Sequence, residues 1–68
     1  MTAQEIVDNG YYPNPERRRI ISACQFMANM GRGDWAFSVI FMAGDVLFTT
    51  EDDLVVIAQD KRGQWKIQ

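Results

Sequence analysis

Hydrophobic periodicity changes once along this chain, at Gly31-Arg32-Gly33-Asp34, and this change constrains the fold more than any other feature. Before it, apolar residues recur with the 3.6-residue period of a helix; after it, they alternate with the two-residue period of a strand. A chain of 68 residues that carries both patterns is long enough for one hydrophobic core. Residues 1–68 are therefore predicted to form a single small α+β domain.

The helical part of the pattern predicts one long helix over residues 14–31. Asn14 can accept a free amide at its start, Pro15 suits the first helical position, and Gly31 suits a left-handed end. The polar residues fall on one narrow stripe, formed by Arg18, Ser22, Gln25 and Asn29. The remaining apolar arc spans roughly 220°, about twice the ~100° that packing on one sheet requires. We therefore expect this helix to contact more than one layer.

Residues 1–13 are predicted to be an N-terminal segment and linker. Thr2 and Glu5 have the spacing of a capping box, and Asn9-Gly10 is a typical helix end, which together indicate a short helical turn. The following Tyr11-Tyr12-Pro13 cannot continue the helix, because proline lacks an amide donor and favours an extended residue before it.

Residues 35–68 are predicted to form an antiparallel sheet. Alternation over residues 35–43 indicates the first strand, Gly44-Asp45 suits a two-residue hairpin turn, and residues 46–50 indicate the second strand. This turn places Ala43 opposite Val46. In that register Phe41 faces Phe48 on one side of the sheet, and Met42 faces Leu47 on the other.

Residues 50–62 allow two interpretations. Thr50 followed by Glu51-Asp52-Asp53 and an apolar run also resembles a helix start. The β-branched residues at 55–57 instead favour a strand, and Lys61-Arg62-Gly63 suits a three-residue hairpin loop that pairs Asp60 with Gln64. We favour the strands, because an inner face then forms from Val55, Ile57, Trp65 and Ile67. The expected fold is a short N-terminal helical turn and one long helix packed on a four-stranded antiparallel β-meander.

The residue content argues against an enzyme. The chain has no histidine and one cysteine, Cys24, so it has no Ser/His/Asp or Cys/His catalytic set, no internal disulfide and no zinc cage. Cys24 lies in the apolar arc and is expected to be a small buried hydrophobe. Glu51-Asp52-Asp53 lacks the spacing of a calcium loop and is expected to be a solvated turn. We expect no catalytic residues, metal or cofactor.

Charge and hydropathy predict a soluble, cytoplasmic protein without membrane association. The net charge is −2, and the first ten residues have neither the basic region nor the apolar core of a signal peptide. The longest apolar stretch, residues 35–43, is about half of a membrane span. A lone cysteine agrees with a reducing compartment.

The sheet has more apolar residues than one helix can cover. If the face with Phe37 and Phe48 packs on the helix, Ile40, Met42 and Leu47 lie on the opposite face, where an exposed apolar patch indicates an interface. We expect a larger protein or a second copy of the chain, in a homodimer, to bind there. The alternative is that the first ten residues and the Tyr11-Tyr12 linker wrap under the sheet and close it.

Two further groups are candidate partner-binding residues. Arg17, Arg18 and Arg19 begin the helix and Arg32 follows its end, so they can contact an acidic ligand or form a solvated helix start. Tyr11 and Tyr12 can anchor a partner or pin the linker to the core. Together they suggest an alternative function, nucleic-acid binding with tyrosine stacking. The acidic balance makes nucleic acid the less favoured partner.

These observations favour a small non-enzymatic regulator or inhibitor that binds and covers a surface of a larger protein. Accessory proteins of phages and mobile elements, including inhibitors of host defence, have this size and character.

Overall fold

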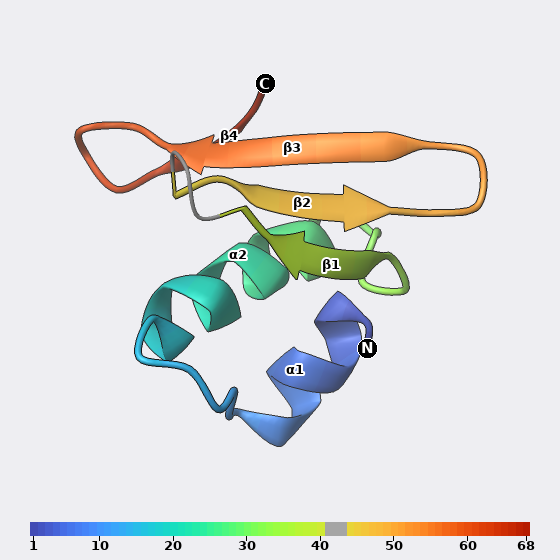
Figure 1. Cartoon of the computed structure of the whole chain (residues 1–68), viewed down its shortest axis with the longest axis horizontal. Helices are drawn as coiled ribbons and strands as arrows, with labels where there is room; N and C mark the ends of the chain where they lie inside the picture. Colours follow the sequence, from blue (N-terminus) through green and yellow to red (C-terminus); the bar gives the residue numbers. More distant parts are fainter. Residues whose placement is uncertain (41–43) are drawn as a thin grey trace.

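The computed structural model describes residues 1–40 and 44–68, and it confirms the predicted α+β fold (Figure 1). Its elements are α1 (Ala3–Asn9), α2 (Arg17–Asn29), β1 (Ala36–Val39), β2 (Val46–Thr49), β3 (Leu54–Gln59) and β4 (Trp65–Ile67). The strands form one antiparallel sheet in the order β1-β2-β3-β4, which is the predicted meander.

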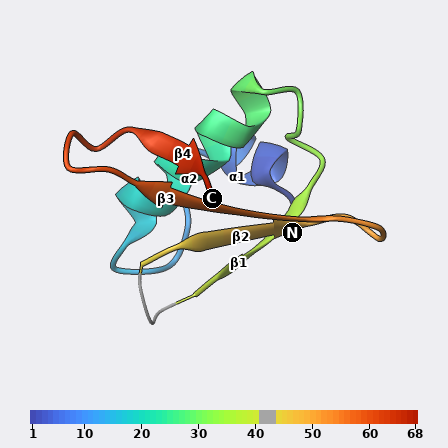
Figure 2. The ribbon, with the colours of Figure 1, turned by 90° about the horizontal axis from the view of Figure 1, so that it is seen from above.

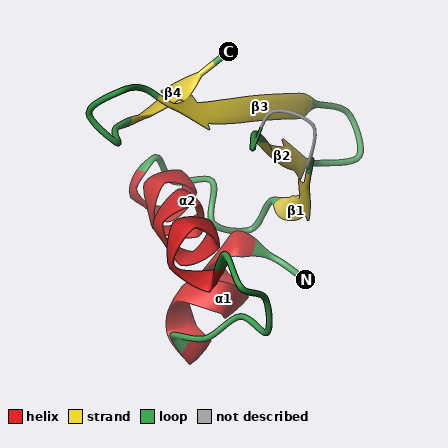
Figure 3. Cartoon of the chain, turned by 60° about the vertical axis from the view of Figure 1, so that its left-hand side comes forward, coloured by secondary structure: helices red, strands yellow, loops and turns green. Residues whose placement is uncertain are grey.

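Both helices lie on the same face of the sheet, with α2 between α1 and the strands (Figures 2 and 3). The broad apolar arc of α2 thus contacts two layers, as its width predicted. The alternative in which the first ten residues wrap under the sheet is wrong, because α1 packs on α2, and Ala3 and Ile6 are buried there. The core between these layers consists of Ala3, Ile6, Ile20, Ala23, Cys24, Met27, Val46, Phe48, Val55 and Ile57.

The N-terminal capping box is confirmed. The Glu5 amide donates to the Thr2 hydroxyl oxygen at 3.3 Å, and the Thr2 amide donates to a Glu5 carboxylate oxygen at 3.2 Å. Gly10 ends α1 in the left-handed conformation, with φ of 64°. This short helix is further fixed to the start of β1, because the Ala3 amide donates to the Trp35 carbonyl at 3.0 Å.

The long helix begins at Arg17, three residues later than predicted. The Asn14 side chain does accept an amide, that of Glu16 at 2.9 Å, and the Asn14 carbonyl accepts from Arg17 at 3.0 Å. These bonds close a separate turn over residues 14–17, so Asn14 caps this turn and not the helix itself. The end is as predicted: Gly31 is left-handed, with φ of 76°, after the last helical residue, Asn29.

The register of the first hairpin differs from the prediction by four residues. Val39, not Ala43, lies opposite Val46, and Phe37, not Phe41, lies opposite Phe48. Leu47 accordingly pairs with Ser38 and not with Met42. The Ile40 amide donates to the Asp45 carbonyl at 3.1 Å, so the connection is longer than the two-residue turn expected at Gly44-Asp45. Phe41, Met42 and Ala43 lie outside the described residues.

The second half of the sheet follows the prediction closely. Residues 54–59 form a strand, so the helical interpretation of this region is wrong. The Asp60 amide donates to the Gln64 carbonyl at 2.9 Å, and Gly63 is left-handed, with φ of 81°. This three-residue loop places Ile57 opposite Ile67, on the face toward the helices.

Gly33 permits the close approach of α1 to the end of α2. It is buried, its carbonyl accepts from the Gln4 amide at 2.7 Å, and a Cβ there would lie 3.2 Å from the Gln4 Cβ. A side chain at this position would crowd Gln4, so glycine suits this contact.

Candidate functional site: the outer face of the sheet

The face of the sheet that points away from the helices, called here the outer face, is partly apolar. Strand pairing arranges its side chains in three rows across the strands. The first row is Ala36, Thr49 and Leu54; the second is Ser38, Leu47, Val56 and Gln68; the third is Ile40, Asp45, Ala58 and Lys66. Leu54 is 55% exposed, and Leu47 and Val56 are half-buried by their neighbours in the sheet.

No helix covers the outer face in the part of the chain that the structure describes (Figure 2). Two of the three predicted interface residues, Ile40 and Leu47, belong to this face. The third, Met42, lies outside the described residues. Sequence reasoning missed Leu54 and Val56, although both follow from the alternation along β3 once that segment is taken as a strand.

Opposite charges flank the two ends of the outer face. The exposed turn between β2 and β3 carries three carboxylates, those of Glu51, Asp52 and Asp53. The hairpin between β3 and β4 carries the exposed side chains of Lys61, Arg62 and Lys66, together with Asp60. Asp45 lies at the same end as this hairpin. β3 therefore runs from an acidic end of the sheet to an end where basic residues outnumber acidic ones.

Asp60 organises the basic hairpin. Its carboxylate accepts from the amides of Arg62 at 2.8 Å and Gln64 at 3.0 Å, and it lies 3.6 Å from the Lys66 ammonium. The backbone hydrogen bond from Gln64 is the main reason that the pKa of this carboxyl lies below its ordinary value, and the Arg62 amide and Lys66 act in the same direction. The ionised carboxylate thus holds the loop that presents Lys61 and Arg62.

The predicted arginine cluster is divided between different surroundings. Arg17 and Arg18 are exposed, whereas Arg19 turns toward the sheet. Arg32 follows the other end of α2, about 20 Å away along the helix axis, with its guanidinium carbon 5.3 Å from the centre of the Trp35 ring. The four guanidinium groups therefore do not form one surface.

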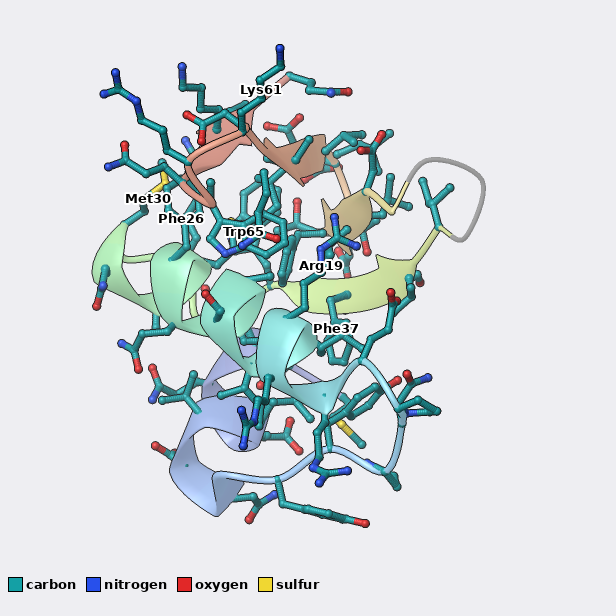
Figure 4. All side chains as sticks on the ribbon, turned by 90° about the vertical axis from the view of Figure 1, so that its left-hand side faces the viewer. Arg19, Phe26, Met30, Phe37, Lys61 and Trp65 are labelled. Carbon is teal, nitrogen blue, oxygen red and sulfur yellow. The ribbon has the colours of Figure 1, made fainter. Side chains whose placement is uncertain are left out.

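Arg19 and three other side chains form a contact between α2 and the last hairpin, called here the α2–β4 contact. Arg19 donates through Nε to the Gln59 amide oxygen at 3.0 Å, and its guanidinium carbon lies 5.4 Å from the centre of the Trp65 ring. The Trp65 indole donates to the Ser22 hydroxyl at 2.9 Å. Figure 4 shows Arg19 and Trp65 approaching each other between α2 and the sheet.

The two tyrosines also separate. Tyr12 packs against the core, with its ring edge-to-face on Phe37 at a centroid distance of 5.4 Å, whereas Tyr11 is 60% exposed. Tyr12 thus pins the linker, and only Tyr11 is free to contact a ligand.

Cys24 is fully buried, and burial raises the pKa of its thiol to about 11.

The chain also has a shallow open depression of about 600 Å³ between α1 and the end of α2, with Glu5, Asp8 and Asp34 on its rim. This depression was not predicted from the sequence, because its walls come from α1 and the end of α2, which only the tertiary fold brings together. Across residues 1–40 and 44–68, no three potential ligand side chains gather to hold a metal ion.

Among the described residues, no helix has both the length and the apolar character needed to cross a membrane. Comparison with known proteins found no matching family model, no matching curated protein and no matching solved structure.

Proposed function

We propose that this chain is a non-enzymatic protein-binding module, a small regulator or inhibitor that covers a surface of a larger protein with its outer face. One observation carries the proposal: both helices pack on one face of the sheet, and Leu47, Leu54 and Val56 on the other have no covering element in the described chain. The length of 68 residues also suits an accessory protein of a phage or mobile element, such as an inhibitor of host defence.

The arrangement of side chains on the outer face supports an interface. The four strands have four, four, six and three residues of about 3.3 Å each and lie about 4.8 Å apart, which gives a face of about 270 Å². The outer face also has the anatomy of an interface, with Leu47 and Val56 at its centre and polar or charged side chains at its rim.

The state of Cys24 supports a function without covalent catalysis. A cysteine nucleophile must be a thiolate and must reach its substrate. Cys24 is 0% exposed, and its pKa of about 11 keeps the thiol protonated at neutral pH.

The alternative function, nucleic-acid binding, has less support from the geometry. Duplex binding draws its affinity from several basic side chains that contact phosphates along one surface. Here Arg19 is engaged with Gln59, Arg32 lies at the far end of α2, and the net charge is −2.

The test is affinity capture from the native host with three forms of the chain: wild type, Leu47→Glu and Gln25→Glu. The control position, Gln25, is exposed on the polar stripe of α2, so Gln25→Glu adds the same negative charge away from the outer face. We expect a protein that binds wild type and Gln25→Glu, is lost with Leu47→Glu, and survives nuclease treatment. The purified partner should then bind the chain directly with the same dependence on Leu47.

Loss of all captured proteins on nuclease treatment would replace this proposal with the nucleic-acid alternative. Equal capture by Leu47→Glu and wild type would show that the outer face is not the binding surface.

A further inference from the structure

We propose that in the absence of a larger partner the outer face binds the outer face of a second copy, with the two-fold axis running across the strands. The inference rests on the proposed function in one respect, that the outer face is the binding surface. It adds the identity of an occupant and the orientation in which it binds.

The charges at the ends of β3 select this orientation. Two identical faces can stack about a two-fold axis that lies between them, either along the strands or across them. An axis along the strands places Glu51 and Asp52 of both copies together, and like charges at an interface are unfavourable. An axis across the strands instead places these carboxylates over Lys61 and Arg62 of the second copy, twice in each dimer.

The sizes of the outer-face side chains match the same arrangement. A two-fold axis that crosses the strands at the middle row places each strand over the same strand of the second copy. The first row of one copy then lies over the third row of the other. Leu54 then lies over Ala58 of the second copy, and Ile40 lies over Ala36, so a large side chain meets a small one in each case.

Polar groups also meet polar groups. In the same arrangement Thr49 lies over Asp45 of the second copy, where a hydroxyl can donate to a carboxylate. The middle row of one copy lies over the middle row of the other, so Leu47 and Val56 of both copies form the centre of the interface. Aligned sheets pack about 10 Å apart with an angle near −30°, which keeps residues close to the axis in contact.

The dimer should be reversible, because the interface is small. About 270 Å² from each copy is about a third of the ~800 Å² per partner that stable complexes bury. We expect a dissociation constant between about 1 µM and about 1 mM. A larger partner that needs the same face would then compete with the second copy.

Sedimentation equilibrium of the purified chain tests self-association. Wild type and Gln25→Glu should dimerise as the concentration rises toward about 1 mM, and Leu47→Glu should stay monomeric with an unchanged far-UV circular dichroism spectrum. Leu54→Gln, at a position 55% exposed, serves as a second variant if Leu47→Glu does not fold, and it should weaken the dimer. Monomeric wild type throughout this range, or a dimer that both substitutions leave intact, would overturn the proposal.

Charge reversal tests the orientation. Glu51→Lys with Asp52→Lys makes both ends basic, and Lys61→Glu with Arg62→Glu makes both ends acidic. Each pair alone should weaken the dimer about tenfold at low salt. The chain with all four substitutions keeps the net charge of −2 and regains complementary ends, so it should dimerise like wild type. A fourfold variant as weak as either pair would overturn the proposed axis.

The two proposals fail in different ways. If wild type is monomeric but its captured protein depends on Leu47, the inference is wrong and the proposed function stands. If wild type dimerises through Leu47 and no protein or nucleic acid is captured, the proposed function is wrong, and the outer face serves self-association alone.

Discussion

The three consecutive arginines offer a direct test of the structure, because their side chains have different surroundings. Arg19 bonds to Gln59 and lies over the Trp65 ring, whereas Arg18 is exposed on the polar stripe of α2. We predict that Arg19→Met destabilises the chain and that Arg18→Met does not. Both substitutions remove one positive charge, and methionine has nearly the helix propensity of arginine, so these effects cancel in the comparison.

The expected magnitude follows from the two lost interactions. A hydrogen bond from a guanidinium to a partly buried amide contributes about 1 kcal/mol, and a cation–π contact at a partly exposed site contributes about 0.5–1 kcal/mol. Arg19→Met should therefore lower the free energy of unfolding by about 1.5–2 kcal/mol. For a domain of this length that corresponds to a decrease in Tm of about 10 °C. Arg18→Met should stay within about 0.5 kcal/mol of wild type.

Urea and thermal unfolding at low micromolar concentration, followed by circular dichroism and tryptophan fluorescence, measure this difference. A double-mutant cycle of Arg19→Met with Gln59→Ala should give a coupling free energy of about 0.5–1 kcal/mol, because the two side chains are in direct contact. If Arg18→Met and Arg19→Met destabilise equally, Arg19 does not hold α2 to the last hairpin.

Three further predictions concern the core, the N-terminal cap and the cysteine. Phe48→Ala should cost about 3–5 kcal/mol, because Phe48 is fully buried, and should unfold most of the chain at 37 °C as seen by circular dichroism; a loss under 1 kcal/mol would remove Phe48 from the core. Thr2→Ala should cost about 1 kcal/mol and speed amide hydrogen exchange in α1 more than in β3, since it removes the capping box; uniform acceleration would contradict a local cap. Burial raises the pKa of Cys24 from 9.0 to about 11, so the folded chain favours the neutral thiol, and stability should fall as the pH rises from about 9 to about 11. The stability of wild type relative to Cys24→Ala should change by about 1.4 kcal/mol per pH unit within that window and stay constant below it; a constant difference across the window would refute the assignment.

The sequence predicted the strand pairing correctly where the residues of a short loop determine the conformation of that loop. The hairpin at residues 60–64 was predictable because Gly63 can adopt positive φ, and a three-residue loop then sets the pairing of Ile57 with Ile67. The register of the first hairpin was not predictable in this way. Gly44-Asp45 resembles a two-residue turn, but the strand pairing begins at Ile40 and Asp45.

The four-residue error in that register left the outer face almost unchanged. Side chains alternate with a period of two, so a shift by an even number keeps each residue on its own side of the sheet. Ile40 and Leu47 were thus assigned to the correct face in the wrong register.

The directions of side chains and the contacts between separate elements could not be predicted from the sequence. Nothing in three consecutive arginines distinguishes Arg19, which turns toward Gln59, from its exposed neighbours. In the sequence Gly33 stands out only as part of the segment where the periodicity changes, yet its role depends on Gln4, which lies 29 positions earlier in the chain. Both depend on how separate elements pack, which periodicity does not encode.

The α2–β4 contact has a consequence for folding kinetics. Each strand pairs with its neighbour in sequence, so the meander can form through short loops, whereas Arg19 and Gln59 are separated by 40 positions and Ser22 and Trp65 by 43. Closing a longer loop costs more chain entropy, so these bonds should form after the rate-limiting step. Their loss would then leave the folding rate unchanged and accelerate unfolding, so this contact should help to set how long the native state persists.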